Sequence, residues 1–184
     1  MRIIGGRFKG AKLHLASKGD FRPTSSVVKE ALFNIIADKV AGSTFLDLYA
    51  GSCAVGVEAF SRGSKSVTFV DKILYQTQIS KIREITGDSF IELRFVKSDV
   101  VKFLESTLSS KMKYDIIFAD PPWGDPYDES LFQLSLRLLS EGGVFIVESY
   151  KKSLLPAEDT VEGLGISVDK RRYGDTKLSF YQKI

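Results

Sequence analysis

Residues 45–63 read FLDLYAGSCAVGVEAFSRG, and this stretch decides the class of fold. It begins as a short apolar strand, turns at a glycine, and continues with a helical pattern. Strands that alternate with helices in this way are typical of a parallel sheet covered by helices. A glycine turn after such a strand also brings the backbone close to a ligand at the carboxyl ends of the strands.

The same order of strand, turn and helix repeats toward the C-terminus. The predicted strands are residues 44–49, 66–71, 91–96, 114–120 and 143–149, with helical stretches near 54–62, 73–86, 99–109 and 127–140. We therefore expect a sheet covered on both faces, with right-handed crossovers. Residues 165–183 contain two alternating runs around a Tyr-Gly-Asp-Thr turn, so the sheet is predicted to close with an antiparallel hairpin.

The N-terminal part precedes this repeating pattern. Residues 1–15 alternate loosely around two glycines, which indicates a small basic hairpin. A helix is expected to follow, with Thr24 or Ser25 as its N-cap. Its apolar face is predicted from helical spacing to contain Val28, Leu32, Ile35 and Ile36. The chain is interpreted as one domain, residues 1–184, in which residues 1–23 form an appendage and residues 24–42 lead into an α/β core at 43–184.

Charge is distributed unevenly along the chain. The 184 residues carry a formal net charge of only +3, with a calculated isoelectric point of about 8.9. The first 29 residues, however, contain many cations against the single acid Asp20: Arg2, Arg7, Lys9, Lys12, Lys18, Arg22 and Lys29. This end of the chain predicts either a polyanionic partner or a solvated basic surface.

Other features of the composition narrow the class of protein. The single cysteine, Cys53, permits no disulfide within the chain, which fits a reducing compartment. One histidine, His14, with one cysteine cannot supply a histidine-based zinc site, so no metal is expected. No apolar run has the length of a membrane span or a secretory leader. A cytoplasmic protein is predicted, and nothing in the sequence requires an oligomer, so a monomer is expected.

The glycine turn distinguishes two classes of cofactor. Dinucleotide-binding enzymes use G-x-G-x-x-G, whereas here Gly51 and Gly56 have Cys53 between them. Asp47 at the end of the strand would repel a pyrophosphate, but it suits the ammonium group of S-adenosylmethionine. The turn therefore favours the methyl donor, with a purely structural β–α turn as the alternative.

Further acidic residues follow the next strands. Asp71 ends the second predicted strand and can accept hydrogen bonds from both hydroxyls of a ribose, in either class of cofactor. Asp99 follows the third strand and can cap the next helix, bind an adenine amino group, or do both. Asp120 closes the fourth strand. Since the carboxyl ends of parallel strands share one edge of the sheet, we expect these carboxylates at one rim.

Residues 118–127, FADPPWGDPY, carry the second chemical signal. Proline fixes φ and restricts the residue before it, so Asp120, Pro121 and Pro122 should form a stiff extended segment. The Asp120 carboxylate and the Pro121 carbonyl are both acceptors, and together they suit a planar amino group. Trp123 offers a flat ring for stacking on a base. The segment therefore predicts methylation of the exocyclic amine of a flipped or unpaired base, against a packed surface turn as the alternative.

These segments carry a family resemblance. DLYAGSCAVGVEAFSRG followed by DPPW is similar to S-adenosylmethionine-dependent amino-methyltransferases with a Rossmann-like fold. MRIIGGRFKGAKL and RPTSSVVKEALFNII, at residues 1–13 and 22–36, resemble the bacterial 16S ribosomal RNA guanine-N2 methyltransferases in particular. The similarity covers almost the whole chain. It implies a seven-stranded sheet, S-adenosylmethionine as cofactor, and guanine 966 of 16S rRNA in the 30S particle or its precursor as substrate.

The resemblance also implies roles for particular residues. Catalysis is expected from the segment Asp120, Pro121, Pro122 and Trp123. RNA contact is expected from Arg2, Arg7, Lys9, Lys12 and Arg22. Cofactor contacts are expected from Arg22, Pro23, Thr24, Asp47, Tyr49, Gly51, Ser52, Gly56, Asp71, Lys72, Asp99, Val100 and Asp120. The chain departs from the family at Cys53, where glycine is usual, and at Trp123, where tyrosine or phenylalanine is more frequent.

Three other functions compete with this interpretation. A methyltransferase for DNA adenine or protein glutamine would share the chemistry, although DNA enzymes usually add a target-recognition region and glutamine enzymes favour Asn at position 120. A nicotinamide-dependent oxidoreductase is opposed by the missing middle glycine. A non-catalytic RNA-binding protein on the same fold is opposed by the intact Asp120 and the rim acids, although Cys53 leaves it open.

Overall fold

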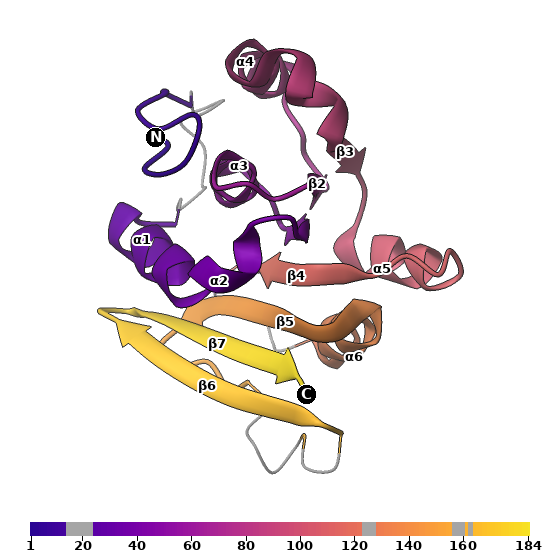
Figure 1. The fold of residues 1–184 in the computed structure, drawn as a ribbon. Helices are drawn as coiled ribbons and strands as arrows, with labels where there is room; N and C mark the ends of the chain where they lie inside the picture. The colour runs from indigo at the N-terminus through magenta and orange to yellow at the C-terminus, as the bar shows by residue number, and fades with distance from the viewer. Residues whose placement is uncertain (14–23, 123–127, 156–160, 162–163) are drawn as a thin grey trace.

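The computed structural model describes residues 1–13, 24–122, 128–155, 161 and 164–184. One seven-stranded sheet forms its centre, with strand order β3-β2-β1-β4-β5-β7-β6 (Figure 1). The strands are β1 (Thr44–Leu48), β2 (Ser66–Asp71), β3 (Leu93–Lys97), β4 (Tyr114–Ala119), β5 (Leu139–Tyr150), β6 (Ile166–Tyr173) and β7 (Thr176–Lys183). Strands β1 to β5 pair in parallel, and β7 pairs antiparallel with both β5 and β6. This arrangement confirms the predicted fold class, including the antiparallel C-terminal hairpin.

Helices connect the parallel strands and precede the first of them. They are α1 (Ser26–Ile35), α2 (Ala37–Val40), α3 (Ala54–Ser61), α4 (Gln76–Thr86), α5 (Val100–Leu108) and α6 (Glu129–Leu138), with the 3-10 turn η1 (Gly87–Glu92) after α4. Two strand starts differ from the sequence expectation. Residues 91–92 belong to η1 and not to a strand, and β5 starts at Leu139 and not near residue 143. Among the described residues, no helix has the length and apolar character needed to cross a lipid bilayer.

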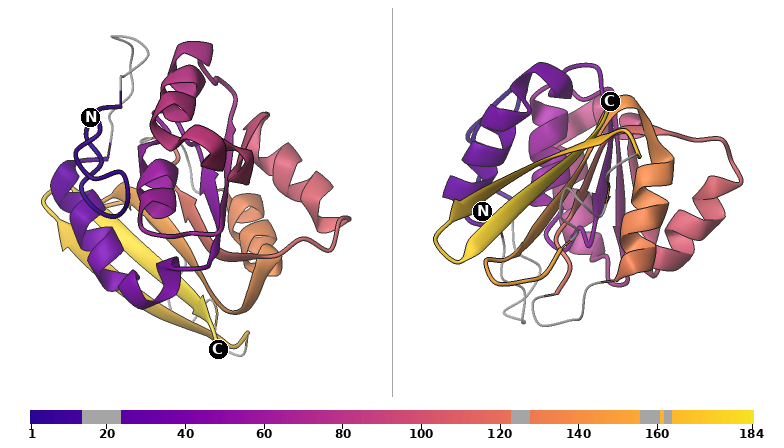
Figure 2. Two further views of the ribbon diagram at one scale, coloured as in Figure 1. Left: turned by 45° about the horizontal axis from the view of Figure 1, so that its top comes forward. Right: turned by 90° about the horizontal axis from the view of Figure 1, so that it is seen from below.

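The helices divide between the two faces of the sheet, as the right-hand view of Figure 2 shows. One core contains side chains of α1 to α4 with alternate residues of the strands, such as Phe45 and Ile116. The other core contains side chains of α5 and α6 with the intervening residues, such as Leu46 and Ile117. This alternation places each strand residue on a defined face, and the site described below depends on it.

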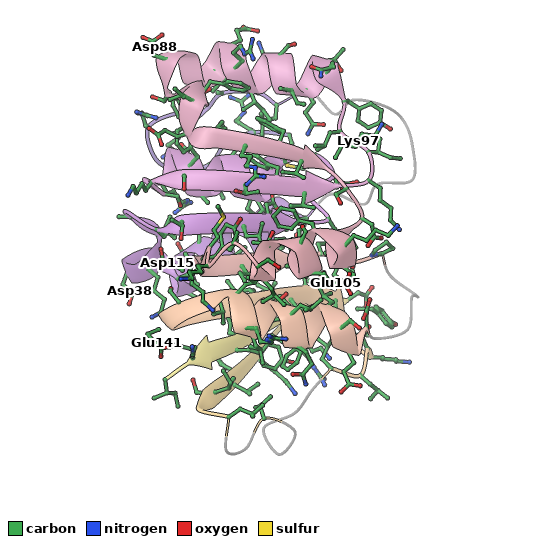
Figure 3. All side chains as sticks on the ribbon, turned by 90° about the vertical axis from the view of Figure 1, so that its right-hand side faces the viewer. Asp38, Asp88, Lys97, Glu105, Asp115 and Glu141 are labelled. Atoms are coloured by element: carbon green, nitrogen blue, oxygen red, sulfur yellow. The ribbon has the colours of Figure 1, made fainter. Side chains whose placement is uncertain are left out.

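The two ends of the sheet have different side chains. Figure 3 labels Asp115 and Glu141 at one end of the sheet and Lys97, the last residue of β3, at the other. Asp115 lies near the start of β4, where it accepts hydrogen bonds from the backbone nitrogen and the hydroxyl of Thr44, both at 2.8 Å. The Asp115 end is therefore the amino edge of the parallel strands, and the Lys97 end is the carboxyl edge.

Residues 1–13 fold back on themselves by antiparallel pairing. A β-bridge joins Arg2 to Lys12, and the backbone nitrogen of Ile3 donates to the carbonyl of Ala11 at 3.0 Å. Ile3 and Leu13 are buried in the same core as α1 and α3. The predicted N-terminal hairpin thus exists as a short closed loop, fixed to the helical layer by its apolar side chains.

A buried ionic network ties this loop to α3. Glu58 on α3 accepts hydrogen bonds from the backbone nitrogen of Ile4 at 2.9 Å and from Nε of Arg62 at 2.8 Å. Its Oε2 also lies 3.1 Å from Nζ of Lys29, and both side chains of this pair are 0% exposed. Lys29 donates in addition to the carbonyl of Arg2 at 3.0 Å. Counting Lys29 with the basic surface was therefore wrong, because its charge is neutralised inside the protein.

Helix α1 follows the predicted pattern with one exception. Ser25 is the N-cap, and its hydroxyl accepts from the backbone nitrogen of Val28. Val28, Leu32 and Ile36 are buried as expected, but Ile35 is 38% exposed. Helical spacing alone cannot predict that Ile35 is exposed while Ile36 is buried, since both lie near the edge of the same apolar stripe of the helix.

Candidate active site

A cleft of about 690 Å³ opens at the carboxyl edge of the sheet. It lies where the chain leaves β1, β2, β3 and β4, which is the usual place for a ligand in an open α/β sheet. Its walls are formed by Thr24, Asp47, Tyr49, Ala50, Gly51, Ser52, Ala54, Val55, Asp71, Lys72, Ile73, Asp99, Val100, Val101, Phe118, Asp120, Pro121, Pro122 and Asp128. The cleft thus brings together ten of the predicted cofactor residues from segments far apart in the sequence.

The loop after β1 is held in an unusual backbone conformation. Tyr49 and Cys53 both have a φ of 57°, the left-handed region that side chains other than glycine rarely adopt. Cys53 is the N-cap of α3, is 1% exposed and does not line the cleft. A left-handed residue here explains physically why glycine is suited to position 53. The cysteine adopts this conformation, and its side chain is part of the core and not of the cleft lining.

Asp71 joins this loop to the end of β2. Its Oδ2 accepts from the backbone nitrogen of Gly51 at 2.8 Å, and its Oδ1 accepts from that of Ile73 at 2.9 Å. Each carboxylate oxygen has a second lone pair, and the side chain lines the cleft. Asp71 can therefore shape the loop and still accept hydroxyl groups of a ligand.

Asp47 lies deeper in the cleft wall and is 2% exposed. Its Oδ2 accepts from the backbone nitrogen of Gly56 at 2.9 Å. Burial raises the pKa of this carboxyl to about 8, the Gly56 hydrogen bond lowers it, and the charge of Asp71 adds to the rise. At neutral pH and with the cleft empty of cations, Asp47 is predominantly protonated.

Because of this shift, Asp47 should make the stability of the protein depend on pH. The unfolded carboxyl loses its proton near the ordinary value of 3.8, whereas the folded one retains it up to about pH 8. The free energy of unfolding should therefore fall as pH rises from about 4 to 8, and then level off. Asp47→Asn should remove this contribution, so its stability relative to the wild type should rise from pH 4 to pH 8, by at most about 6 kcal/mol. Urea unfolding of both proteins between pH 4 and 9 measures this, and two parallel stability curves would contradict it.

Gly56 supports Asp47 and does not touch the cleft. A Cβ at this position would lie 2.4 Å from Cε1 of Phe69 and 2.9 Å from Oδ2 of Asp47. Gly56 is also absent from the residues that line the cleft. The structure thus gives it a packing reason, the close approach of α3 to β1 and β2, in place of the predicted direct cofactor contact.

Substitution of Gly56 by alanine should therefore destabilise the fold. The added methyl must displace Phe69 or the Asp47 carboxylate, and overpacking of this kind costs about 1–3 kcal/mol. Gly63→Ala serves as a comparison. A Cβ at Gly63 would lie 3.7 Å from its nearest neighbour, so it would meet no crowding. Its loss of stability would come from backbone strain, because Gly63 has a φ of 104°. Thermal unfolding of Gly56→Ala with and without Phe69→Leu, a change that makes room for the added methyl, distinguishes crowding from backbone strain. Loss of stability that Phe69→Leu does not relieve would show that crowding is not the reason.

Asp99 and Lys72 form a pair at the mouth of the cleft. Nζ of Lys72 lies 3.1 Å from Oδ2 of Asp99, and the lysine side chain is 72% exposed. Asp99 also caps α5 by accepting from the backbone nitrogen of Lys102, and this bond and Lys72 lower its pKa. The capping role considered from the sequence is confirmed. Val100, the first residue of α5, presents an apolar surface beside the pair.

The end of β4 supplies the opposite lip. The backbone nitrogen of Asp120 lies 3.5 Å from the carbonyl of Leu48, so β4 and β1 stay together up to the cleft. Asp120, Pro121 and Pro122 all line it. Trp123 lies outside the described residues, as do Arg22 and Pro23.

Thr24 enters the cleft from the N-terminal part of the chain. Its hydroxyl donates to Oε2 of Glu148 on β5 at 3.0 Å, and both residues are buried. Sequence reasoning missed Glu148 because it lies within an apolar strand without a motif. It also missed Asp128, which lines the cleft and caps α6 by accepting from the backbone nitrogens of Ser130 and Leu131. An acid three residues before an apolar helical run could have identified this cap.

The predicted RNA-contacting side chains of the first loop are all exposed: Arg2, Arg7, Lys9 and Lys12. The guanidinium of Arg7 lies over the rings of Phe8 and Phe60, 4.4 and 5.4 Å from their centroids. This stacking orients the cation while leaving it accessible.

Comparison with known proteins gives consistent matches. Residues 1–182 match the family model described as Conserved hypothetical protein 95. "Putative rRNA methyltransferase YlbH" of Bacillus subtilis is 32% identical over 100% of this chain and 99% of its own length. "Ribosomal RNA small subunit methyltransferase D" of Escherichia coli is 31% identical over 85% of this chain and 78% of its own length.

The fold has a close counterpart among solved structures. "Putative methyltransferase yhhF from Escherichia coli" superposes with a TM-score of 0.76 and 28% identity, covering 100% of this chain and 97% of the other. The resemblance seen in the sequence motifs is thus confirmed over the whole chain. The chain therefore belongs to the family described as Conserved hypothetical protein 95.

Proposed function

We propose that this protein transfers a methyl group from S-adenosylmethionine to the exocyclic N2 of a guanine in 16S rRNA, the guanine 966 type. One observation carries the cofactor assignment. Among the described residues, the cleft is lined by five aspartates and one lysine, so its lining is acidic even with Asp47 protonated at neutral pH. An acidic cleft suits a ligand that carries a sulfonium and an ammonium group, and it opposes the pyrophosphate of a dinucleotide.

The residues present fit the methyl donor along the cleft. Asp71 has acceptor capacity for ribose hydroxyls, and Asp99 with Val100 offers an acceptor and an apolar surface for adenine. Asp47 lies where the loop after β1 meets α3, and a cationic group beside it would favour its ionised form. When bound, the donor supplies a methyl group already activated by the positive sulfur.

The chain's contribution to the chemistry is positioning and charge. The Asp120 carboxylate and the Pro121 carbonyl are acceptors at the lip of the cleft, and each can take one N–H of an exocyclic amine. Such hydrogen bonds orient the amine and favour positive charge on its nitrogen as the new C–N bond forms. The proton that the nitrogen then loses passes to Asp120 or to water. Pro121 and Pro122 keep these acceptors in place, because the ring of each proline fixes its φ.

The basic N-terminal loop, residues 1–13, and the names of the relatives support RNA as the substrate. The "Ribosomal RNA small subunit methyltransferase D" match is the reason to propose the small-subunit particle or its precursor over free DNA. The exposed cations of residues 1–13 provide the phosphate contacts that such a partner requires. We propose that the protein acts there as a monomer in the cytoplasm.

A methyl-transfer assay tests this function. Methyl-labelled S-adenosylmethionine is incubated with the protein and, in separate tubes, unmethylated 30S particles, naked 16S rRNA, duplex DNA and protein. Label that digests to N2-methylguanosine is the expected result. Label only in DNA or protein would keep the chemistry and overturn the substrate. Failure of the protein to bind S-adenosylmethionine by calorimetry would overturn the cofactor assignment.

A further inference from the structure

A second cationic surface lies at the end of the C-terminal hairpin. Strand β6 ends at Tyr173 and β7 begins at Thr176, and Thr176 pairs with Tyr150 at the end of β5. Since Ala119 of β4 pairs with Val147 of β5, the hairpin turn extends beyond the level of Asp120. The turn therefore projects from the carboxyl edge of the sheet, the edge that carries the cleft.

Basic residues are concentrated at this turn and on the strands that lead to it. The described cations are Lys151, Lys152, Lys170, Arg171, Arg172 and Lys177, and the described acids among them are Asp169 and Asp175. This excess of four positive charges is larger than the net charge of +3 of the whole chain. The remaining part of the chain is close to neutral, so this surface is a distinct electrostatic feature.

Ion pairs neutralise only part of the positive charge of this surface. Arg171 pairs with Asp169 at 2.9 Å and Lys151 with Asp175 at 2.8 Å. Lys152, Lys170 and Arg172 are exposed and have no acidic partner within ion-pair distance among the residues that the structure describes.

The register of the hairpin also places its exposed cations Lys170 and Arg172 on one face, beside the buried Lys177. Arg172 pairs with Lys177 and Lys170 with Ser179, so Lys170, Arg172 and Lys177 project to the same side of the sheet. Burial lowers the pKa of Lys177, and the charges of Lys170 and Arg172 lower it further. Lys177 is buried and donates to the carbonyl of Ser153, so Lys170 and Arg172 are the cations of this face that remain accessible to an anionic partner.

Two tyrosines flank the same turn. Tyr150 and Tyr173 both pair with Thr176, one from each side, so they lie on the face opposite to Lys177. Both are partly exposed. These rings therefore lie on the other face of the hairpin from Lys170 and Arg172, the face on which Tyr173 packs against the core shared with the N-terminal loop.

This surface and the basic N-terminal loop lie on the same side of the molecule. In Figure 1 the turn between β6 and β7 and the N-terminal loop are both at the left, the side to which the arrowhead of β4 points. Both views of Figure 2 agree with this placement. Lys170 is level with Ala119 through Val147 and Ser179, and three strand spacings of about 5 Å separate β4 from β6, so Lys170 is on the order of 15 Å from the lip of the cleft.

We propose that the end of the β6–β7 hairpin is a second RNA-contacting surface, with Lys170 and Arg172 binding phosphates of the strand whose base enters the cleft. The N-terminal loop and the hairpin then give the RNA two separate contacts on the side of the molecule where both lie. This inference rests on the proposed rRNA methyltransferase function and adds a contact that neither the sequence motifs nor the resemblance indicated.

The test compares two double variants of equal charge. Lys170→Gln/Arg172→Gln removes the proposed contacts, and Lys65→Gln/Lys111→Gln removes two exposed cations at the opposite edge, before β2 and β4. Dissociation constants for unmethylated 30S particles and for a 16S rRNA fragment containing the target loop are measured between 50 and 200 mM salt. The hairpin variant should bind about ten-fold more weakly at the lower salt, and its log–log salt slope should fall by about 1.4. The control variant should keep the wild-type slope.

The readouts separate the failure of this inference from the failure of the proposed function. Calorimetry with S-adenosylmethionine should give the same affinity for the hairpin variant as for the wild type, since neither residue lines the cleft. Equal salt slopes for both double variants, with wild-type methylation intact, would overturn the hairpin surface alone. Wild-type protein that binds the donor but no RNA would overturn the proposed substrate and this inference with it.

Discussion

Asp120→Ala is expected to lower the turnover of methyl transfer by about 10²–10³-fold while the affinity for S-adenosylmethionine changes little. The carboxylate is one of two acceptors at the lip of the cleft, next to Pro121. Removing it takes away an interaction that strengthens as charge develops on the target nitrogen. Single-turnover rates with saturating 30S particles measure the loss, and calorimetry measures the donor affinity.

A matched variant distinguishes this effect from a general change of charge in the cleft. Asp128 also lines the cleft, but its side chain caps α6. Asp128→Asn removes the same charge and keeps a good cap, so it should retain turnover within about three-fold. Equal losses in the two variants would mean that Asp120 acts only through the net charge of the cleft.

Glu58→Leu is expected to lower the free energy of unfolding by about 3–5 kcal/mol, the cost of leaving a buried charge without its partner. Lys29 would lose its counterion while both sites stay fully buried, and the backbone nitrogen of Ile4 would lose its acceptor. Urea denaturation gives the change in stability. Limited proteolysis within residues 1–13 should become faster, because Glu58 connects this loop to α3.

Two companion variants identify the source of the loss. Lys29→Met/Glu58→Leu replaces the pair with apolar side chains of similar size and should recover part of the stability. Glu58→Gln keeps an acceptor for Ile4 and should fall between the wild type and Glu58→Leu. A double variant as unstable as the sum of the two single changes would show that Lys29 and Glu58 do not act as a pair.

The parallel core and the acidic rim could be predicted because each depends on local signals. The glycine turn and each of the four aspartates lie within a few residues of the end of their own apolar strand. The rule that ligands bind at the carboxyl edge of an open α/β sheet then brings Asp47, Asp71, Asp99 and Asp120 to one cleft.

What the sequence could not show depends on contacts between distant residues. The burial of Lys29 follows from Glu58, which lies 29 positions later and has no motif. The partner of Thr24 is Glu148, 124 positions away. The role of Gly56 required the position of the Phe69 ring. The ends of β3 and β5 also differ from the prediction, since apolar residues near a strand end are compatible with a 3-10 turn or with a longer strand.

The cations on the outer strands have a consequence for self-association. Strand order places β3 and β6 at the two borders of the sheet, where unpaired backbone groups could recruit a strand from another molecule. Exposed Arg94 and Lys97 on β3, and Lys170, Arg171 and Arg172 on β6, would face like charges in any edge-to-edge dimer. The side chains that we propose to bind RNA would therefore also oppose edge-to-edge pairing of two molecules, and this repulsion would weaken as salt screens the charges.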